Sequence, residues 1–504
     1  MVKKLLLALF ITFNIAYSQN TVGTISITDE VYDGYTLFTV HQKTFLINNC
    51  GEIINEWVSN YTPGSSVYLL PNGNLLRPGQ LDDGSSDIVI GGAGGIVELY
   101  DWNNTLLWSY TYSTGDVRQH HDVYPLPNGN ILMLAISVMT ETEAIQAGRD
   151  PSLLSDNELY SEQILELEPV GTNQANIVWE WNINEHLIQD FDNTKDNFGS
   201  VENNPQLLDI NYLNNNDPVD NWLHFNSIQY DEQRDQIVIS SRKMSEIYII
   251  DHSTTTAEAA SNSGGTYGKG GDLLYRWGNP QAYRNGTSAD RKLFGQHTPY
   301  FIPAGFPNEG SIILFNNGID RSPSYSQVDI ISPPESNLGV YDYTPNTAYL
   351  PNTTDYTYDE MPSSGISEFF TSIVSNAQQL PNGNILVCEG REGNFFELNN
   401  NDEKVWEYKN PVKSNNGTTT TQGDPAPAAS TNLTFRAIKY ALDYAAFAGR
   451  DVTPNGTLEL SPDLTPCNNL SIGDYQQSFA SIYPNPSNGI FNINSQFFNF
   501  HRKI

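Results

Sequence analysis

One phrase recurs three times in this chain. It reads Leu-Pro-Asn-Gly-Asn followed by two aliphatic residues, at 70–76, 126–132 and 380–386. Asn-Gly between apolar runs is the strongest short signal for a β-hairpin, because both central residues of such a turn need positive φ. A degenerate copy lies at 306–313, and a fifth hairpin at 229–238 carries charged residues in its turn. The chain therefore repeats one hairpin along most of its length.

A second pattern follows each hairpin: an apolar run, a polar turn, and a segment that ends in tryptophan. It recurs at 96–108, 164–181, 247–277 and 395–406. Together the two patterns define a unit of four strands, and repetition of such a unit is typical of a β-propeller. Plentiful Tyr, Phe, Gly, Asn and Pro favour the same strands and turns. We predict an all-β, six-bladed β-propeller.

The propeller is expected to span residues 30–450 and to be closed by strands from both chain ends. Three strands between residues 34 and 57 lack a fourth, which we assign to a single strand at 434–440. Pairing of these segments removes the exposed edges of an open ring. A seventh blade would have to be hidden in 184–222 or 330–372. The other five blades are expected at 67–112, 122–183, 225–278, 298–372 and 376–410.

Both ends of the sequence carry export signals. Residues 1–18 have two lysines, a short apolar run and small residues before the expected cut, as in a secretory signal peptide. No segment is long enough to span a bilayer, so we expect an exported protein, periplasmic or at the cell surface, without a membrane span. Residues 481–494 resemble the start of the C-terminal sorting domain of the type IX secretion system, whose machinery is the partner this implies. The chain stops at Ile504, so we expect a partial domain at 476–504, after a linker at 451–475.

Charge and cysteine content narrow the classes of partner and fold. The net charge is −33, from 25 Lys and Arg against 58 Asp and Glu. Such a chain repels phosphate backbones, so we expect no nucleic-acid partner. Three cysteines are an odd number and do not make a disulfide framework. Cys50 and Cys388 fall in expected strands, where we expect them to be small buried apolar residues. A single disulfide bridge is the alternative.

Three histidines occupy equivalent positions in consecutive blades. The innermost strands of a propeller begin at one mouth of its central channel. A lone histidine before a strand is more often structural, but three equivalent ones favour a site, and we expect their imidazoles to converge near the axis. Counting back six residues from the position of the hairpin proline gives, blade by blade, Ser65, His121, His224, His297 and Ser375.

The other histidines are less informative. His120 alternates to the other face of the strand from His121, and is a structural or substrate-binding candidate. Asp122 is likewise expected to point away from His121. No function is predicted for His41, His186, His252 and His501.

Arg242 is the second candidate feature. It ends the strand 237–242, which returns antiparallel to the strand that begins at His224. An arginine beside a histidine cluster favours an anion, because its guanidinium matches sulfate, phosphate or carboxylate. The alternative is a surface ion pair with Glu246 or Asp251. Three histidines could instead hold Zn²⁺, but Arg242 would oppose a cation, so no metal and no cofactor are predicted.

These motifs resemble the bacterial arylsulfate sulfotransferases, which are six-bladed periplasmic propellers. The likeness runs over roughly residues 34–445. The motifs that carry it are His120-His121-Asp122 before a Leu-Pro-Asn-Gly-Asn hairpin, the stretch 222–228 with Ser240-Ser241-Arg242, and Gln296-His297-Thr298.

The resemblance implies an activity and roles. It implies an enzyme that moves a sulfuryl group from an aryl sulfate to a phenol through a sulfohistidine, with ping-pong kinetics and no nucleotide sulfate donor. His297 matches the nucleophile, and His121, His224 and Arg242 match the residues that hold the sulfate oxygens. The further substrate-binding candidates are His120, Asn226 and Thr298.

The residues are chemically consistent with that activity. Neutral imidazole is a competent nucleophile, and Arg242 with a protonated histidine can stabilise the charge that develops on the sulfonyl oxygens and the leaving phenolate. The glycine-rich stretch 91–95 precedes a strand, so it is a turn and not a nucleotide cradle. Two alternatives stay open: a non-catalytic propeller that binds an anionic or glycan ligand, and a metal-dependent hydrolase or lyase on the same channel.

Overall fold

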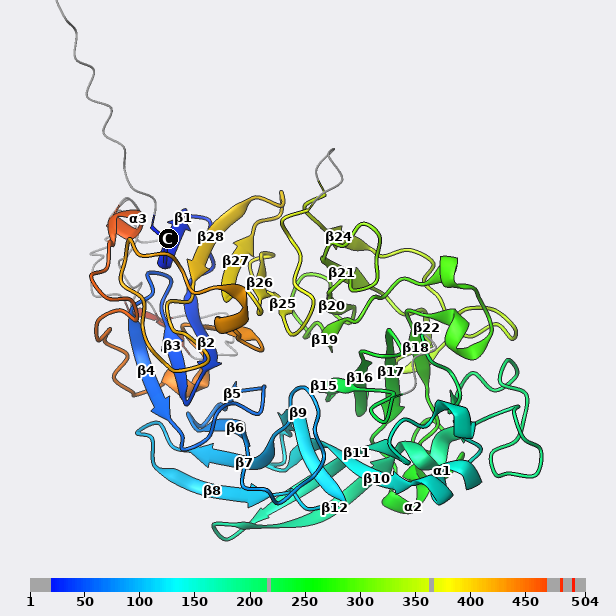
Figure 1. Cartoon of the computed structure of the whole chain (residues 1–504). Coiled ribbons are helices and arrows are strands. Elements are labelled where there is room, and N and C mark those ends of the chain that lie inside the picture. Colours follow the sequence, from blue (N-terminus) through cyan, green and yellow to red (C-terminus); the bar gives the residue numbers. More distant parts are fainter. Residues whose placement is uncertain (1–19, 215–218, 362–366, 469–480, 484–491, 495–504) are drawn as a thin grey trace, which may run out of the picture.

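The computed structural model describes residues 20–214, 219–361 and 367–468, and the backbone of two short strands at 481–483 and 492–494. Six antiparallel sheets are arranged as blades around a central channel (Figure 1). The predicted six-bladed β-propeller is confirmed. The expected signal peptide at 1–18, and most of the stretch that resembles a sorting domain, lie outside the described residues.

We number the blades from the first complete one along the chain, and give each from its innermost strand outward. Blade 1 consists of β5 (Tyr68–Leu69), β6 (Leu75–Gln80), β7 (Gly95–Tyr100) and β8 (Leu106–Thr111). Blade 2 consists of β9 (Val117–Pro125), β10 (Ile131–Thr140), β11 (Glu158–Val170) and β12 (Gln174–Asn182). Blade 3 consists of β15 (Phe225–Asp231), β16 (Gln236–Ser241), β17 (Glu246–Asp251) and β18 (Tyr275–Trp277).

The remaining three blades complete the ring. Blade 4 consists of β19 (His297–Phe301), β20 (Ile312–Asn316), β21 (Gln327–Ile331) and β24 (Tyr356–Tyr358). Blade 5 consists of β25 (Asn376–Gln379), β26 (Ile385–Glu389), β27 (Asn394–Leu398), β28 (Lys404–Lys409) and β1 (Gly23–Ile27). Blade 6 consists of β29 (Ala437–Ala441), β2 (Gly34–Val40), β3 (Lys43–Ile47) and β4 (Ile53–Val58).

Strands from both chain ends close the ring, as predicted. In blade 6 the late strand β29 pairs antiparallel with β2, with Ile438 opposite Leu37. The structure adds β1, which the sequence analysis missed. This strand pairs antiparallel with β28 at the outer edge of blade 5, with Ile27 opposite Trp406. The two ends therefore brace neighbouring blades, and β1 covers an edge that would otherwise be open.

Short elements connect the blades without adding a seventh. The insertion at 184–222 holds the pair β13 (Leu187–Ile188) and β14 (Leu208–Asp209), and the region 330–372 holds β22 (Glu335–Asn337) and β23 (Val340–Tyr341). β30 (Ser481–Tyr483) pairs with β31 (Asn492–Asn494). Within the described ranges no helix is long and apolar enough to cross a membrane. The helices are α1 (Glu141–Gln146), α2 (Thr256–Ala259), α3 (Thr465–Asn468), η1 (Pro151–Leu153), η2 (Ile183–His186), η3 (Pro280–Tyr283), η4 (Ser288–Asp290), η5 (Ala429–Thr431) and η6 (Ala445–Phe447).

The repeated hairpins are present, but their turns differ from the predicted kind. The Gly73 N–H donates to the Leu70 carbonyl at 2.8 Å, and the Leu70 N–H donates to the Asn74 carbonyl at 2.8 Å. Pro71 fixes φ near −65°, which a turn with two positive φ values cannot accept. Only the glycine is left-handed, with φ of 82°, which is a turn followed by a glycine bulge.

The repeated tryptophans join each blade to the next. They lie on outer strands, and each donates its indole N–H to a backbone carbonyl of the following blade, as buried indoles require. The bonds are Trp57 to Asp101, Trp108 to Gln174, Trp181 to Gly271, Trp277 to Pro351, and Trp406 to Asn49, all 2.7–2.9 Å.

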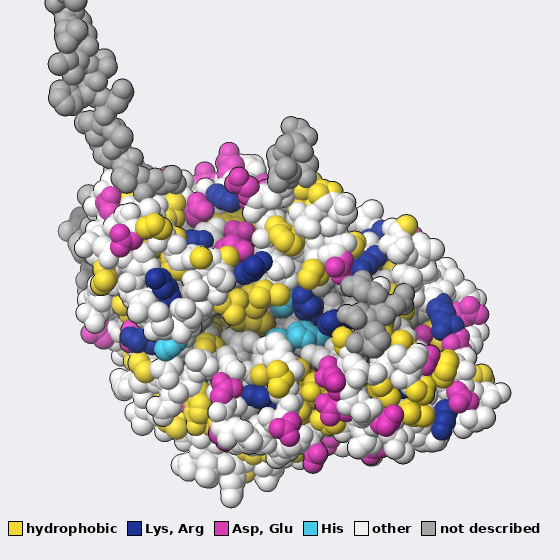
Figure 2. Space-filling model, viewed as in Figure 1, with side chains coloured by type: hydrophobic (Ala, Val, Ile, Leu, Met, Phe, Trp, Pro, Cys, Tyr) yellow, Lys and Arg dark blue, Asp and Glu magenta, His cyan; other side chains and the backbone are white. Residues whose placement is uncertain are grey.

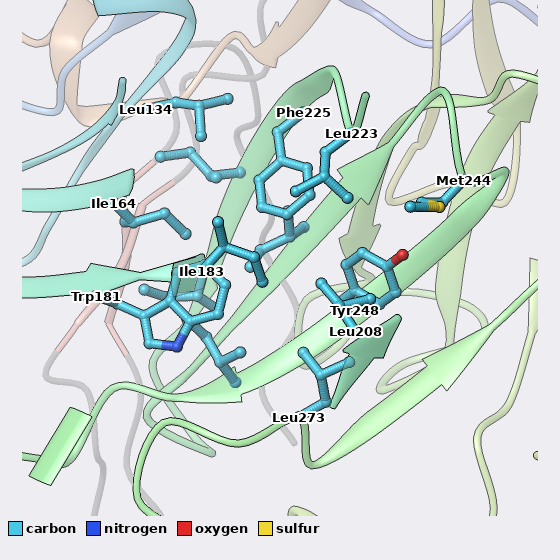
Figure 3. Packing of buried hydrophobic residues seen from close by; sticks show 14 of the residues in the cluster. Leu134, Ile164, Trp181, Ile183, Leu208, Leu223, Phe225, Met244, Tyr248 and Leu273 are labelled. Atoms are coloured by element: carbon cyan, nitrogen blue, oxygen red, sulfur yellow. The ribbon is translucent and has the colours of Figure 1, made fainter. Parts of the chain in front are cut away.

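Apolar faces of adjacent blades pack together between the sheets. Between blades 2 and 3, Ile164 and Trp181 face Phe225 and Tyr248, and all four side chains are fully buried (Figure 3). Because both faces of a blade are covered in this way, the strands carry apolar side chains on both sides.

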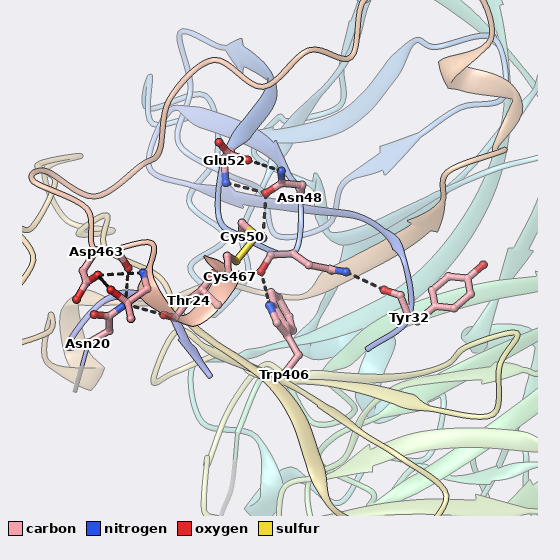
Figure 4. Close-up of a disulfide and its surroundings, with 11 residues drawn as sticks. Asn20, Thr24, Tyr32, Asn48, Cys50, Glu52, Trp406, Asp463 and Cys467 are labelled. Atoms are coloured by element: carbon pink, nitrogen blue, oxygen red, sulfur yellow. Dashed lines mark hydrogen bonds between the residues drawn. A yellow bond between two sulfur atoms is a disulfide. The ribbon is translucent and has the colours of Figure 1, made fainter. Parts of the chain in front are cut away.

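A disulfide corrects the interpretation of the cysteines. Cys50 is bonded to Cys467, across 417 residues of sequence (Figure 4). Cys50 lies in the turn between β3 and β4 and not in a strand, so it does not act as a buried thiol. Cys388 is buried and free in β26, as predicted. The bridge fastens α3 to blade 6, and the Asn455 N–H reinforces this attachment by donating to the Ile53 carbonyl at 2.8 Å.

Candidate functional site

Histidine side chains gather in a hollow at the centre of the ring, beside Lys, Arg and apolar side chains (Figure 2). His297 is the first residue of β19, His224 directly precedes β15, and His121 lies within β9. All three therefore belong to innermost strands of consecutive blades. His121 and His297 are 4% and 2% exposed, and His224 is partly exposed.

A strained backbone position aims these side chains. Four of the five counted residues have positive φ: Ser65, His121, His224 and Ser375. In blade 4 the residue with positive φ is Thr298, with φ of 52°. His297 therefore comes one residue before the position that His121 and His224 occupy in their own blades. Register shifts mark β-bulges in these strands of blades 2, 3 and 4, and bulges re-aim side chains beside functional sites.

The structure brings the three imidazoles into one cluster. The rings of His121 and His224 meet edge to face, with centroids 4.8 Å apart. The ring of Phe435, just before β29, lies 6.2 Å from that of His121 and 6.3 Å from that of His297. Phe435 thus forms an apolar wall between two histidines, and sequence analysis assigned it no role.

Hydrogen bonds fix the proton on His297. Its Nδ1 lies 2.7 Å from Asn317 Oδ1, whose own amide nitrogen donates to the carbonyls of Thr371 and Val374. The Asn317 oxygen must therefore accept, so the proton of neutral His297 is on Nδ1. Nε2 then carries the lone pair, and the Val374 N–H donates to it at 3.2 Å.

A relay of two buried groups stands behind His121. Glu162 Oε2 lies 2.9 Å from His120 Nε2, and His120 Nδ1 lies 2.9 Å from His121 Nδ1. When neutral His120 donates to the carboxylate, its Nδ1 accepts from His121, which leaves the lone pair of His121 on Nε2. An added Cβ at Gly92 would lie 2.2 Å from this Nε2, so glycine keeps the nitrogen uncovered. His120 itself has no ring nitrogen left for a substrate.

His224 has the opposite tautomer from His121 and His297. The side-chain amide nitrogen of Asn221 lies 2.8 Å from His224 Nδ1. Because the amide nitrogen donates, Nδ1 accepts, and the proton of neutral His224 is on Nε2. The cluster therefore offers two acceptor nitrogens, on His297 and His121, and one N–H donor, on His224.

Arg242 adds a positive charge next to the cluster. It directly follows β16, and its backbone N–H donates to the His224 carbonyl at 3.1 Å, so the predicted proximity is observed. Among the described residues its Nε has no hydrogen-bond partner. The alternative ion pair with Glu246 is wrong, because that carboxylate is buried against Arg276; Asp251 instead accepts bonds from Ser253 and Tyr267. A pocket of about 150 Å³ beside Arg242 is also lined by Lys243, Arg291 and Asp320, and the negative charge of Asp320 acts on the Arg242 guanidinium.

Burial and positive neighbours keep the cluster neutral. Burial, and then the proximity of Arg242, lower the pKa of His297 to about 3. Burial followed by the other histidines and Arg242 lowers the pKa of His121 well below 6.5, and the same causes act on the pKa of His224. At neutral pH the free site thus holds uncharged imidazoles beside one guanidinium, so the protonated histidine expected from sequence is not its resting state.

This electrostatic arrangement predicts acid sensitivity of the fold. The unfolded chain binds protons on these histidines near pH 6.5, while folded His297 does so only near pH 3. The free energy of unfolding should therefore fall as pH drops below 6.5, by up to about 1.4 kcal/mol per pH unit for each histidine. Urea unfolding at pH 7, 6 and 5 measures this slope, which should be shallower in His297→Gln. An identical slope in both proteins would contradict it.

The remaining candidates occupy the wall of the channel. Asn226 is buried and donates to the Gln296 carbonyl at 2.8 Å, and its Oδ1 has no partner within the described ranges. The Thr298 hydroxyl donates to the Ser375 carbonyl at 3.1 Å. Asp122 points away from His121, as predicted, and pairs with buried Arg436 at 2.7 Å.

His186 and His252, for which no function is predicted, have hydrogen-bond partners outside the cluster. His186 bonds to Asp272 and the Ala259 carbonyl, and His252 to Glu166 and Asp235. His501 lies outside the described residues. No group of three or more His, Cys, Asp or Glu side chains that could hold a metal ion occurs in the described part of the chain.

The fold and the cluster together define a six-bladed propeller with three histidines and an arginine at one mouth of its channel. The sequence matches the family described as Arylsulfotransferase (ASST) over residues 100–436, more than half of its length. The chain belongs to this family. Comparison with curated proteins found no match.

Comparison with solved structures found distant likenesses. A protein of unknown function from Bacteroides caccae is 11% identical, with a TM-score of 0.42, over 81% of this chain and 98% of its own. A catalytically inactive variant of virginiamycin B lyase from Staphylococcus aureus is 10% identical, with a TM-score of 0.35, over 78% of this chain and 90% of its own. At such scores these likenesses carry no argument about function.

Proposed function

We propose that this protein is an exported arylsulfate sulfotransferase that carries the sulfuryl group on His297. The observation that carries the proposal is the bonding of this histidine. Asn317 holds the proton on Nδ1, and the lone pair is left on Nε2 next to Arg242. Family membership supplies the substrate class, an aryl sulfate. A buried neutral imidazole with its lone pair oriented is an activated nucleophile.

The first half-reaction needs a nucleophile and donors. His297 Nε2 attacks sulfur, the bond from sulfur to the aryl oxygen breaks, and the phenolate leaves with the electron pair. Arg242 and the Nε2–H of His224 donate to the sulfonyl oxygens, where negative charge develops. The Val374 N–H, which contacts Nε2 in the free site, is released by this attack and becomes a further donor.

The second half-reaction needs a base. A phenol enters, His121 Nε2 accepts its proton, and the phenol oxygen attacks the sulfur on His297. The bond from sulfur to Nε2 breaks and returns its electron pair to His297. Glu162 acts through His120 to favour the protonated form of His121 that this step creates. The charge of that imidazolium is thus balanced by a carboxylate within the relay.

Export is supported by two separate features. The first 18 residues resemble a secretory signal peptide. The disulfide between Cys50 and Cys467 suits an oxidising compartment, where such bonds persist. We propose a location in the periplasm or at the cell surface, the latter through the stretch at 481–494 that resembles a sorting domain.

Turnover of 4-nitrophenyl sulfate tests the proposed function. The nitrophenol should be released, and release should accelerate when a second phenol is added, because the acceptor regenerates His297. Absence of release, or a rate indifferent to the second phenol, would contradict a transferase. Tight binding of the ester without any turnover would favour the non-catalytic alternative.

Glu162→Gln should slow only the second half-reaction. Without the carboxylate charge, protonated His121 loses its stabilisation, so steady-state transfer should fall about tenfold to a hundredfold. The burst of nitrophenol in the first turnover should keep nearly its normal rate, which rapid mixing can measure. The matched control is Glu166→Gln, because Glu166 supports His252 and not the cluster. Equal loss of burst and steady state would instead indicate a structural role.

A further inference from the structure

A second cavity occupies the opposite end of the channel. The innermost strands run from the histidine mouth to the opposite end of the channel, and this cavity, of about 480 Å³, is lined by residues at that end, among them prolines of blades 1, 2, 4 and 5. We call it the far cavity. Its volume falls in the range of small-molecule sites. The strand ends that form its rim are Pro71, Pro125, Pro303, Pro381 and Ala441.

A buried ion pair separates the far cavity from the histidines. Arg436 lines the cavity and pairs with Asp122, the residue after His121, at 2.7 and 3.3 Å. Its guanidinium also stacks over the ring of Tyr68, with its central carbon 4.5 Å from the ring centroid. Thr298, the residue after His297, completes the partition. The two ends of the channel are thus separate, and the Arg436–Asp122 pair and Thr298 lie between them.

The far cavity offers no unbalanced positive charge. Arg436 is neutralised by Asp122, and Lys439, the other cation in the lining, is neutralised by Glu397 at 2.7 Å. Both pairs are buried, and each carboxylate would have to be displaced for an anion to bind. The cavity therefore disfavours a sulfate ester, in contrast to the mouth that holds Arg242.

The walls instead offer aromatic faces and unused hydroxyl donors. The hydroxyl oxygens of Tyr300 and Tyr440 accept from the N–H groups of Gln379 and Leu69 at 2.7 and 3.0 Å, so their own hydrogens point elsewhere. Neither hydrogen, nor that of Tyr124, finds an acceptor among the residues that the structure describes. Three phenols that line one cavity are thus left with a proton to donate.

We propose that the far cavity binds a small uncharged aromatic molecule that carries an oxygen acceptor, such as a phenol. The ring of the ligand would pack edge to face against the tyrosines, and its oxygen would accept from their hydroxyl groups. The inference does not depend on catalysis at His297, because none of these tyrosines belongs to the histidine cluster. It assigns to the chain a phenol site that is separate from the site of sulfuryl transfer.

Calorimetric titration with 2-naphthol, using the full chain, tests this inference. Ala441→Trp fills the cavity from its rim and should weaken naphthol binding by at least about tenfold. Tyr440→Phe keeps the ring but removes one donor, and should weaken binding about twofold to tenfold. Tyr444→Phe is the matched control, because the Tyr444 hydroxyl already donates its hydrogen to the Leu69 carbonyl at 2.9 Å. Binding of 2-naphthyl sulfate should be unaffected by all three changes.

The outcomes separate this inference from the proposed function. Naphthol affinity that is unchanged in both Ala441→Trp and Tyr440→Phe would overturn the far cavity as a site. Equal weakening of 2-naphthyl sulfate would also overturn it, because the ligand would then be an anion. Release of nitrophenol from 4-nitrophenyl sulfate, measured in parallel, reports on the histidine cluster and not on the far cavity. A binding result with no turnover would refute the transferase and leave the far cavity standing.

Discussion

His297→Ala will abolish sulfuryl transfer, with kcat at least about a thousandfold below that of the natural protein. The substitution removes the only nitrogen proposed to bond to sulfur, and neither His121 nor His224 can replace it. The Nε2 lone pair of His121 is assigned to accept the proton of the phenol, and His224 presents a hydrogen where a lone pair is needed. Steady-state release of nitrophenol, with and without a phenol acceptor, measures the loss.

The control for this experiment is His41→Asn. His41 lies in the turn between β2 and β3 with φ of 53°, a conformation that asparagine accepts. Its activity should match that of the natural protein, which would show that loss of an arbitrary histidine is harmless. A His297→Ala protein that keeps normal burst and steady-state rates would contradict the assigned nucleophile.

Arg242→Met should lower kcat/KM by about a hundredfold to a thousandfold, because a donor to the developing charge is removed. The same change should also move the pH profile. Arg242 is the leading charged group that depresses the pKa of His297, so without it this pKa rises. Protonation of His297 then begins at higher pH, and the acid limb of kcat/KM should shift upward.

Arg391→Met is the matched control for Arg242. Both side chains bond to Ser372, Arg242 to its carbonyl and Arg391 to its hydroxyl. The pKa of His297, however, responds to Arg242 and not to Arg391 among its leading causes. Arg391→Met should therefore leave the acid limb in place. A shift of equal size in both variants would mean that the effect is a general one of surface charge.

The fold could be predicted from sequence because its signals are local and repeated. Leu-Pro-Asn-Gly-Asn specifies a hairpin wherever it occurs, and the tryptophan that follows marks an outer strand. The type of turn could not be predicted from Asn-Gly alone, since Pro71 overrides it. β1 was missed because it is an isolated strand that follows neither repeated pattern. Its partner β28 is far away in sequence, since Ile27 pairs with Trp406.

The site was predictable in part for the same reason. His121 and His224 share a place in the repeat, His297 lies one residue before that place, and Arg242 is tied to His224 by one hairpin. Asn317 directly follows β20 as Arg242 directly follows β16, so the hairpin argument applied to Arg242 would also have placed Asn317 near His297. Glu162 and Phe435, which orient or wall the imidazoles, follow no repeat. They reach the cluster only through tertiary packing, so no spacing in the sequence identifies them. Cys467 likewise meets Cys50 only after the ring has closed.

Intact mass spectrometry after brief exposure to an aryl sulfate, without any acceptor, tests the central claim most directly. The account predicts a protein heavier by one sulfuryl group, with the added mass on His297 after fragmentation, and loss of that mass when a phenol is added. Release of phenol without such an adduct, or an adduct on a different residue, would contradict it.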